Sequence, residues 1–572
     1  MAHKISGSEA LVEALRIEGV DTIFGLVGSA FMDPLDLFPK AGIRFIQVRH
    51  EQSASLMAEG YARATGRPGV CIGQNGPGVT NLVTGVASAY LNHSPVVVLT
   101  PAVTSPTIGT RTFQEIDQMR LFGPIVNYQI QVNQPSRIGE SIRSAFRAAV
   151  ATRGPAQVDI PRDVYYGTWE DEPLEPSQYR TDGRYGGASQ QAVAQAAGLL
   201  LDAERPFILV GMGAIDSEAG AAIAELAERL GAAVGCVYSH NDAFPASHPL
   251  AVGPIGYQGS LAAMKLIAEA DLVLALGTRL NTFGTNPQYD FDYFPRTARL
   301  VHNSINPMEL GALRPIDAGL IGDCKAVVEQ LLHATRDKRP RSDRPARERR
   351  IAEAKQEWAD KLRDMSLGGD RPMHARRVLW EIARALPKEA AVVTDIGNVS
   401  GTANGYFEFD TPRRWFAPGS LGGIGVSYPT ALGVKLALPH LPVVTLVGDG
   451  AWGMTMQEVM TAVTEKINVV ALLLNNSQYG AEKRNQYDFF GERFFWTDLD
   501  NPDFAAVAEK MGAAVIRVES PEQVGPAVQE ALRMNRPVVV NILIDPKVLT
   551  EPYRRDALRM PNRVMERYRE PA

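Results

Sequence analysis

Short apolar runs alternate with helix-like stretches along the whole chain. The runs do not alternate between apolar and polar residues, so they predict strands that are buried on both faces. Buried strands separated by helices are typical of parallel sheets built from β–α–β units. The predicted strands form three groups: 22–28, 45–51, 69–78, 95–101 and 156–163; then 206–213, 232–239, 271–279 and 299–305; then 390–397, 442–450, 468–476, 513–520 and 537–545.

Two polar segments separate these groups. Residues 168–189 join the first group to the second, and residues 336–350 precede the third with eight basic and three acidic side chains. We interpret the second segment as a solvated linker that leads into a helix rather than as a nucleic-acid or lipid patch. The sequence therefore predicts an α/β protein with three doubly wound parallel-sheet domains. Their expected bounds are 1–170, 190–335 and 373–572, the last with a C-terminal tail, and a charged linker fills 336–372.

Composition narrows the range of partners. The 572 residues are 45% hydrophobic and carry a net charge of −6, whereas general binders of nucleic acid or anionic membranes are usually basic. No run reaches the roughly 18 apolar residues of a membrane helix, and the N-terminus lacks the apolar segment of a signal peptide. Cys71, Cys236 and Cys324 form no CxxC pair, so we expect buried thiols and a cytoplasmic protein. Neither nucleic acid nor membrane is expected as a partner.

The strongest chemical signal lies at two strand ends in the third group. One predicted strand ends in Gly448-Asp449-Gly450, and the next ends in Asn475-Asn476, so that Asp449 and Asn476 are 27 residues apart. One β–α–β step brings such strand ends to the same edge of a sheet, where open α/β sheets bind ligands. A carboxylate and an amide oxygen suit Mg²⁺ or Ca²⁺, and a helix that begins near Ala451 offers N–H groups to phosphate. The pattern predicts a metal-bridged diphosphate site.

Further candidates lie at strand ends and turns in each of the three groups. Glu51 ends the predicted strand at 45–51 and precedes a helix, where an apolar pocket would raise its proton affinity. Residues 74–78, QNGPG, form a strand-to-helix turn in which Asn75 caps the helix or points inward.

The glycine-rich segment 419–425 predicts another tight turn. Gly211 and Gly213 match part of a dinucleotide fingerprint; we read them as a turn, with a nucleotide-binding regulator or a flavin or nicotinamide oxidoreductase as the alternatives.

Together these motifs resemble the thiamine-diphosphate-dependent enzymes, whose metal site is marked by GDG followed by NN about one β–α–β step later. The resemblance covers the whole chain, in the order pyrimidine-binding domain, Rossmann-like middle domain and diphosphate-binding domain. It implies thiamine diphosphate and Mg²⁺ as cofactors, with Asp449, Asn476 and the backbone carbonyl of Gln478 as metal ligands. It also implies a homodimer or homotetramer in which the pyrimidine-binding domain of one chain and the diphosphate-binding domain of another enclose one cofactor.

The resemblance assigns roles to individual residues. Glu51 is expected to contact N1′ of the aminopyrimidine and to promote the tautomer that removes the C2 proton of the thiazolium, and Ile424 to support the bent cofactor between its rings. The expected cofactor-binding residues are Gly28, Asn75, Gly76, Asn398, Ser400, Gly423, Ile424, Gly450, Ala451 and Tyr479. His50, His93 and Gln114 are candidates for proton handling and carbonyl polarisation.

Several stretches, among them YGAEKRNQ at 479–486 and EPYRRDA at 551–557, resemble the sulfoacetaldehyde acetyltransferases of this family. The implied reaction converts sulfoacetaldehyde and phosphate to acetyl phosphate and sulfite. The alternatives are a 2-oxoacid decarboxylase and an acetolactate-synthase-like carboligase. Because sulfonate and phosphate favour cationic and polar partners, the candidates for binding the anionic substrate or phosphate are Ser29, Arg111, Lys483, Arg484, Arg554 and Arg555.

The chain departs from the resembled pattern at two places near the expected site. Arg49 precedes His50 where the pattern has alanine, and Thr110-Arg111-Thr112 follows Gly109 where the pattern continues with QGG. The added positive charges of Arg49 and Arg111 change the expected preference among anionic substrates and leave the expected cofactor the same.

Overall fold

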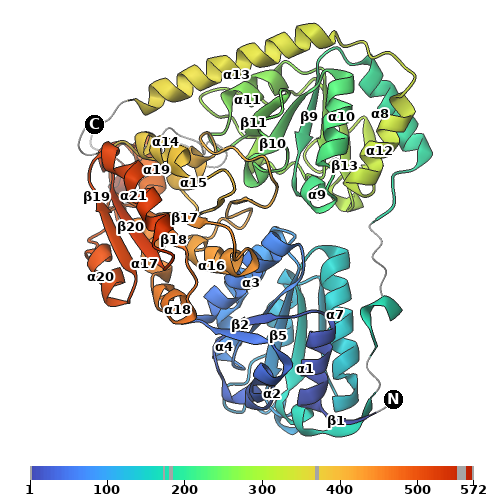
Figure 1. The fold of residues 1–572 in the computed structure, drawn as a ribbon, viewed down its shortest axis with the longest axis vertical. Helices are drawn as coiled ribbons and strands as arrows, with labels where there is room; N and C mark the ends of the chain where they lie inside the picture. The colour runs from blue at the N-terminus through green and yellow to red at the C-terminus, as the bar shows by residue number, and fades with distance from the viewer. Residues whose placement is uncertain (1–2, 172–173, 180–184, 368–372, 550–561, 570–572) are drawn as a thin grey trace.

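A computed structural model of the protein describes residues 3–171, 174–179, 185–367, 373–549 and 562–569, and it has three domains (Figure 1). Each domain contains a six-stranded sheet in which neighbouring strands are parallel. Helices cover the sheets, so the expected class of three doubly wound α/β domains is confirmed. Among the described residues, none of the helices is both long and apolar enough to span a membrane.

The N-terminal domain has the strand order β3-β2-β4-β5-β7-β6. A small antiparallel ribbon of β1 (His3–Ser6) and β8 (Thr168–Asp171) lies beside it. The strands are β2 (Thr22–Gly25), β3 (Arg44–Gln47), β4 (Gly69–Ile72), β5 (Val96–Ala102), β6 (Tyr128–Gln131) and β7 (Ala156–Pro161). Its longer helices are α1 (Gly7–Ile17), α3 (Glu51–Thr65), α5 (Val83–Leu91) and α7 (Ile138–Thr152), and its shorter ones are α2 (Met32–Leu37), α4 (Pro77–Asn81) and α6 (Gln118–Phe122).

The middle domain has the strand order β11-β10-β9-β12-β13-β14 and encloses a core of its own. Its strands are β9 (Pro206–Val210), β10 (Ala233–Val237), β11 (Ala251–Ile255), β12 (Leu272–Leu276), β13 (Arg299–Ser304) and β14 (Ala318–Ile321). Its helices are α8 (Gln190–Asp202), α9 (Met212–Asp216), α10 (Gly220–Leu230), α11 (Leu261–Ala268) and α12 (Cys324–Thr335).

The C-terminal domain has the strand order β16-β15-β17-β18-β20-β19. Its strands are β15 (Ala391–Thr394), β16 (Trp415–Phe416), β17 (Val443–Gly448), β18 (Val470–Asn475), β19 (Ala514–Val518) and β20 (Val538–Leu543). Its helices are α14 (Ala375–Ala385), α15 (Asn398–Ala403), α16 (Ser427–Ala437), α17 (Asp449–Thr455), α18 (Glu458–Glu465), α19 (Gly480–Phe489), α20 (Phe504–Lys510) and α21 (Pro521–Arg533).

Glycines allow the N- and C-terminal domains to pack tightly within one chain. A Cβ on Gly60 of α3 would lie 2.3 Å from the carbonyl oxygen of Thr430, and one on Gly433 of α16 would lie 2.0 Å from that of Met57. The two helix backbones are therefore in direct contact, and the inner faces of both domains share one hydrophobic core. This contact sets the orientation of the N-terminal sheet relative to the C-terminal sheet.

The charged segment after the middle domain forms a long helix, α13 (Arg344–Ser366), which runs across the top of the molecule in Figure 1. The helix begins after Asp343, whose side chain accepts a hydrogen bond from the Ala346 N–H. Its apolar residues join two domains, because Ile351 packs in the core of the middle domain and Leu362 in that of the C-terminal domain.

Candidate functional site

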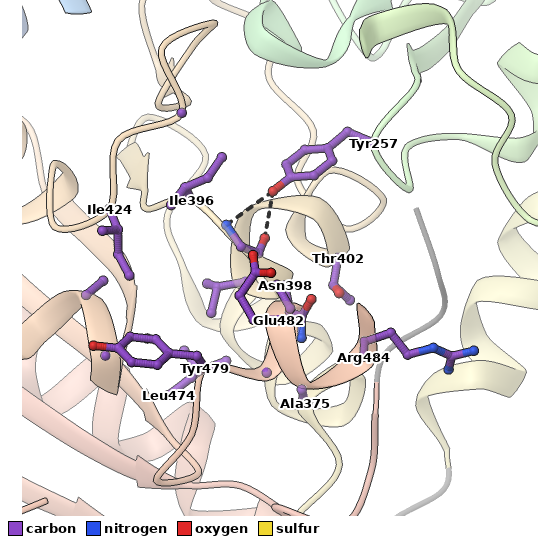
Figure 2. Close-up of a pocket in the computed structure, with 18 of the residues that line it drawn as sticks. Tyr257, Ala375, Ile396, Asn398, Thr402, Ile424, Leu474, Tyr479, Glu482 and Arg484 are labelled. Carbon is purple, nitrogen blue, oxygen red and sulfur yellow. Dashed lines mark hydrogen bonds between the residues drawn. The ribbon is translucent and has the colours of Figure 1, made fainter. Parts of the chain in front are cut away.

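A cavity of about 1120 Å³ opens where β15, β17 and β18 end, between the middle and C-terminal domains (Figure 2). The loops and helix starts that follow these strands form one wall, and residues of the middle domain form the opposite wall. Parallel strands present their carboxyl ends at one edge of a sheet, so this is the place where open α/β sheets bind ligands.

Asp449 lines this cavity and is only 2% exposed. Burial raises its pKa, while N–H groups of Asn476 and Gln478 lie near enough to the carboxylate to oppose that shift. These residues come together because β17 and β18 are neighbours in the sheet. The Asn501 amide also donates to Asp449 Oδ2 at 2.7 Å. The carboxylate thus lies beside two residues, Asn476 and Gln478, that also carry amide and carbonyl oxygens, the kinds of ligand that Mg²⁺ accepts.

Within the part of the chain that the structure describes, no three His, Cys, Asp or Glu side chains gather as metal ligands. A cation at Asp449 would therefore depend on amide and carbonyl oxygens. Two buried amide oxygens at this cavity, Asn398 Oδ1 and Gln478 Oε1, accept no hydrogen bond. Since buried polar atoms are normally satisfied, these oxygens indicate a polar ligand.

Three helices begin at the cavity: α15 at Asn398, α17 at Asp449 and α19 at Gly480. Their first N–H groups have no partner within the helix and favour an anion. Gly450 keeps this end of the cavity compact, because a Cβ there would lie 2.4 Å from the Tyr479 ring. Helix starts around a buried carboxylate can hold a polyphosphate together with its divalent cation.

The loop at 419–425 forms the next part of the wall and is held from two sides. The Asp395 carboxylate accepts from the Gly425 N–H at 2.9 Å, and Asn92 Oδ1 accepts from the Ser420 N–H at 3.1 Å. The Arg279 guanidinium of the middle domain donates to Ser420 Oγ at 2.6 Å. All three domains therefore fix this loop, which places Ile424 at the cavity.

Replacing Gly419 with alanine is expected to lower the free energy of unfolding by about 1–3 kcal/mol. Gly419 has φ 71°, and a Cβ there would lie 1.7 Å from Asn92 Oδ1. Gly422→Ala is the matched control, because Gly422 has φ 64° but its added Cβ would meet no atom closer than 3.7 Å. Chemical denaturation should therefore show a clearly larger loss for Gly419→Ala, and equal losses would contradict this assignment.

Candidate residues of the N-terminal domain form a second cluster around the Gln74 side chain. The Gln74 amide nitrogen donates to Asn75 Oδ1 at 2.5 Å and to Gln114 Oε1 at 3.0 Å, and Ser29 Oγ lies 3.4 Å away. A Cβ on Gly28 would lie 2.2 Å from Gln74 Oε1, and one on Gly76 would lie 2.4 Å from the Gln114 carbonyl oxygen. Five of the predicted residues therefore meet where β2 and β4 end.

Glu51 belongs to this second cluster and is 5% exposed. The Asn81 amide donates to Glu51 Oε2 at 2.9 Å, and the other carboxylate oxygen lies against Gly78. His50 caps α3 through its ring nitrogen Nδ1, which accepts from the Gln52 N–H at 3.2 Å. The N–H groups that precede Glu51 are held by Glu458 of the C-terminal domain, at 3.2 Å from each.

The two clusters do not meet within one chain. Every residue of the described chain that lines the cavity lies at or after Tyr238, so Glu51 and the Gln74 cluster are not part of its wall. Each cluster is instead bordered by exposed apolar side chains, which include Phe113 at 85% and Trp496 at 92% exposed. The further exposed apolar residues of these two borders are Val27, Met32, Ile108 and Ile116 in the N-terminal domain and Met454, Tyr479, Phe494 and Phe495 in the C-terminal domain.

Other predicted residues lie away from the cavity. His93 is at the junction of the domains, with Nε2 at 3.3 Å from both Arg279 and Glu309, and burial together with Arg279 lowers its pKa. Ser400 is buried against Thr394 at 2.9 Å, and Gly423 is not among the lining residues.

The cationic candidates are placed differently from one another. Lys483 pairs with Asp498 at 2.6 Å outside the cavity, whereas Arg484 lines the cavity and pairs with Asp488 at 2.9 Å. Arg111 is exposed on a loop of the N-terminal domain. Arg554 and Arg555 lie outside the described residues.

The sequence motifs did not indicate the wall that the middle domain contributes. Tyr238, Tyr257 and Phe283 form an aromatic cluster there, with ring centroids 5.3–5.7 Å apart. The available signal was the pair Gly256 and Gly259 on either side of Tyr257, which marks a special turn. His374, Arg376 and Glu482 also line the cavity without having been predicted.

The partial dinucleotide fingerprint of the middle domain is explained by packing. A Cβ on Gly213 would lie 2.6 Å from the Cα of Gly277, and one on Gly211 would lie 2.7 Å from the Gly277 carbonyl oxygen. The two glycines thus let the turn after β9 touch the end of β12, as a close backbone crossing requires.

Comparison with known proteins agrees with this geometry. Three family models match the chain in order: the N-terminal TPP binding domain of thiamine pyrophosphate enzymes at 5–121, their central domain at 193–331 and their C-terminal TPP binding domain at 395–542. Thiamine pyrophosphate is another name for thiamine diphosphate.

Several relatives that match nearly the whole chain carry the names of enzymes. Proteins named sulfoacetaldehyde acetyltransferase from Alcaligenes xylosoxydans xylosoxydans and Castellaniella defragrans are each 44% identical, over 99% of this chain and 98% of their own. A probable acetolactate synthase large subunit of Methanocaldococcus jannaschii is 34% identical over 95% of this chain and 92% of its own. With the domain order, the cavity and these relatives in agreement, the chain belongs to the thiamine pyrophosphate enzyme family.

Proposed function

We propose that this protein is a thiamine-diphosphate-dependent acyltransferase that converts sulfoacetaldehyde and phosphate to acetyl phosphate and sulfite. The observation that carries the proposal is the 44% identity, over nearly the whole length of both chains, to relatives named sulfoacetaldehyde acetyltransferase. The relatives named acetolactate synthase are more distant, at 32–34% identity. In the proposed reaction the aldehyde carbon loses its hydrogen as a proton, the C–S bond breaks and sulfite leaves with the electron pair. The vacated carbon gains a proton, and the former aldehyde carbon bonds a phosphate oxygen.

The residues at the carboxyl ends of β17 and β18 fit the cofactor. Asp449, Asn476 and the Gln478 carbonyl would hold Mg²⁺, and Asn398, Gly450, Ala451 and the starts of α15 and α17 would bind the diphosphate. Ile424 and Tyr479 would support the rings, and the free acceptor oxygens on Asn398 and Gln478 suit the cation or an N–H donor of the cofactor rather than its phosphate oxygens. When bound, thiamine diphosphate supplies the nucleophilic carbon and the electron sink that the protein side chains lack.

A second copy of the chain would complete the site. Glu51 of the partner subunit would hold a proton at the cofactor's pyrimidine nitrogen, beside the partner's Gly28, Asn75 and Gly76. Two observations support this arrangement: Glu51 is absent from the cavity wall of its own chain, and exposed apolar side chains border both clusters. Large exposed apolar patches mark protein–protein interfaces. A homodimer is the smallest assembly that satisfies this, and a homotetramer of two such dimers satisfies it equally.

The two anions must be bound by local groups because the chain carries a net charge of −6. Arg484 at the cavity, with Ser29 and Arg111 of the partner subunit, would bind sulfonate or phosphate, and Gln114 of the partner subunit would polarise the carbonyl. Lys483, Arg554 and Arg555 are further candidates for these anions, and His50 and His93 for proton handling. All three cysteines are buried and unpaired, which supports a reducing compartment such as the cytoplasm.

A product assay tests the proposed reaction. The purified protein with thiamine diphosphate and Mg²⁺ is expected to release sulfite and acetyl phosphate from sulfoacetaldehyde only when phosphate is present. Pyruvate is the matched substrate for the alternative reactions. Release of CO₂ or acetolactate from pyruvate, without sulfite or acetyl phosphate from sulfoacetaldehyde, would contradict the proposed function and favour a decarboxylase or carboligase.

A further inference from the structure

A buried loop of the middle domain, residues 254–260, holds helix α15 of the C-terminal domain. The Tyr257 hydroxyl donates to the Gly397 carbonyl oxygen at 2.8 Å and accepts from the Gly397 N–H at 3.2 Å (Figure 2). The Tyr257 carbonyl oxygen accepts from the Asn404 amide at 3.2 Å. Gly397 and Asn404 cap the two ends of α15, so Tyr257 fixes both ends of that helix.

The neighbouring residue, Gln258, also forms hydrogen bonds to the C-terminal domain. Its Oε1 accepts from Thr402 Oγ1 of α15 at 3.3 Å and from Arg376 of α14 at 3.2 Å. The middle domain holds Gln258 in turn, because Gln288 accepts from its N–H at 2.9 Å and the Tyr289 hydroxyl donates to its carbonyl oxygen at 2.8 Å. The loop is therefore fixed on one side by its own domain and on the other side by α15.

The loop has an unfavourable backbone conformation. Gly256, Tyr257 and Gln258 have φ of 72°, 42° and 54°, and the last two carry side chains that disfavour this region. Both are 1% exposed, so solvent does not stabilise the turn. Strained residues persist where surrounding contacts determine them, and they concentrate at ligand sites. Here the contacts that hold them converge on α15.

Helix α15 begins with Asn398, which lines the cavity and has a free acceptor oxygen. Its amide nitrogen lies close to the start of α19, where a Cβ on Gly480 would be 2.9 Å away. We propose that Tyr257 is a positioning residue for the cofactor: its hydroxyl holds the Gly397 peptide so that Asn398 and the start of α15 face the diphosphate before it binds. The proposal rests on the proposed function for the identity of this ligand.

The variant Tyr257→Phe removes the hydroxyl but keeps the ring that faces Gly401, where an added Cβ would lie 3.3 Å from the ring. The helix start then has to be ordered by the ligand itself, which lowers affinity. We expect thiamine diphosphate with excess Mg²⁺ to bind about five- to tenfold more weakly by calorimetry. Amide hydrogen exchange in residues 397–404 of the cofactor-free protein should also become faster.

Tyr293→Phe is the control, because the Tyr293 hydroxyl also donates to a glycine carbonyl, that of Gly284 at 2.7 Å, but within the middle domain. It should lower the thermal midpoint about as much as Tyr257→Phe does while leaving cofactor affinity and exchange in α15 unchanged. The positioning role would be overturned if Tyr257→Phe bound the cofactor with unchanged affinity, or if both variants lost the same amount of cofactor affinity. Failure of the proposed function would look different, since the wild-type protein would then bind the cofactor without forming acetyl phosphate.

Discussion

Replacing Asp449 with alanine is expected to abolish activity and to weaken the binding of Mg²⁺ and thiamine diphosphate by more than about 100-fold, since even residues behind a metal ligand contribute 10- to 100-fold. Burial removes water from this carboxylate, which makes its charged form costly without a cation and raises its pKa. The melting temperature of the cofactor-free variant should therefore change little, while the stabilisation that Mg²⁺ and cofactor give the wild-type protein should disappear. Thermal unfolding with and without both ligands measures this.

Asp545→Asn is the matched control for that substitution. Asp545 also lines the cavity, but its carboxylate accepts from the Lys547 N–H at 2.8 Å and has no proposed metal role. This control should keep the stabilisation by Mg²⁺ and cofactor. If Asp449→Ala keeps it as well, Asp449 is not a metal ligand.

The second large effect is expected at Glu51. Glu51→Gln should lower turnover about 100- to 10,000-fold, which is the range that a positioned acid or base contributes. Glutamine keeps the size of the side chain and can still accept from the Asn81 amide, which bonds Glu51 at 2.9 Å. Steady-state kinetics should therefore show a loss in kcat, while calorimetry shows cofactor binding close to that of the wild type.

Glu59→Gln provides the comparison on the same helix. Glu59 is 1% exposed and accepts from the Asn92 amide at 2.6 Å, far along α3 from the Glu51 cluster. Its substitution should reduce stability by about 1–3 kcal/mol and leave most of the turnover. A Glu51→Gln variant that retains wild-type kcat would remove Glu51 from the mechanism.

The interior strands were all predictable from the sequence, whereas four of the six strands at sheet edges were not. All fourteen predicted apolar runs overlap a strand of the three six-stranded sheets. Four strands of these sheets escaped prediction, β6, β11, β14 and β16, and each lies at the edge of its sheet. An edge strand needs no continuous apolar run because one side lacks a neighbour, as the sequence YQIQ of β6 illustrates. Strand pairing, rather than local hydrophobicity, determines these elements.

In the candidate site too, residues placed by local sequence could be predicted, and residues placed by contacts between distant segments could not. The glycine-rich turns and Asp449 could be identified because a strand, a turn and a helix start are contiguous in sequence. Tyr257 could not, because it reaches Gly397 across 140 residues and from another domain. Strand patterns in the sequence also could not predict that Glu51 lies away from the cavity of its own chain. That separation depends on how α3 packs against α16.

If two copies of the chain each supply half of one active site, as proposed, mixed subunits should show it most directly. Glu51→Gln and Asp449→Ala chains with different tags are each expected to be inactive alone. In a hybrid dimer, one of the two sites would combine an intact Glu51 with an intact Asp449. Random pairing of equal amounts should then restore about a quarter of wild-type activity, because half of the dimers are hybrids. Hybrid preparations no more active than their parents would contradict the shared site.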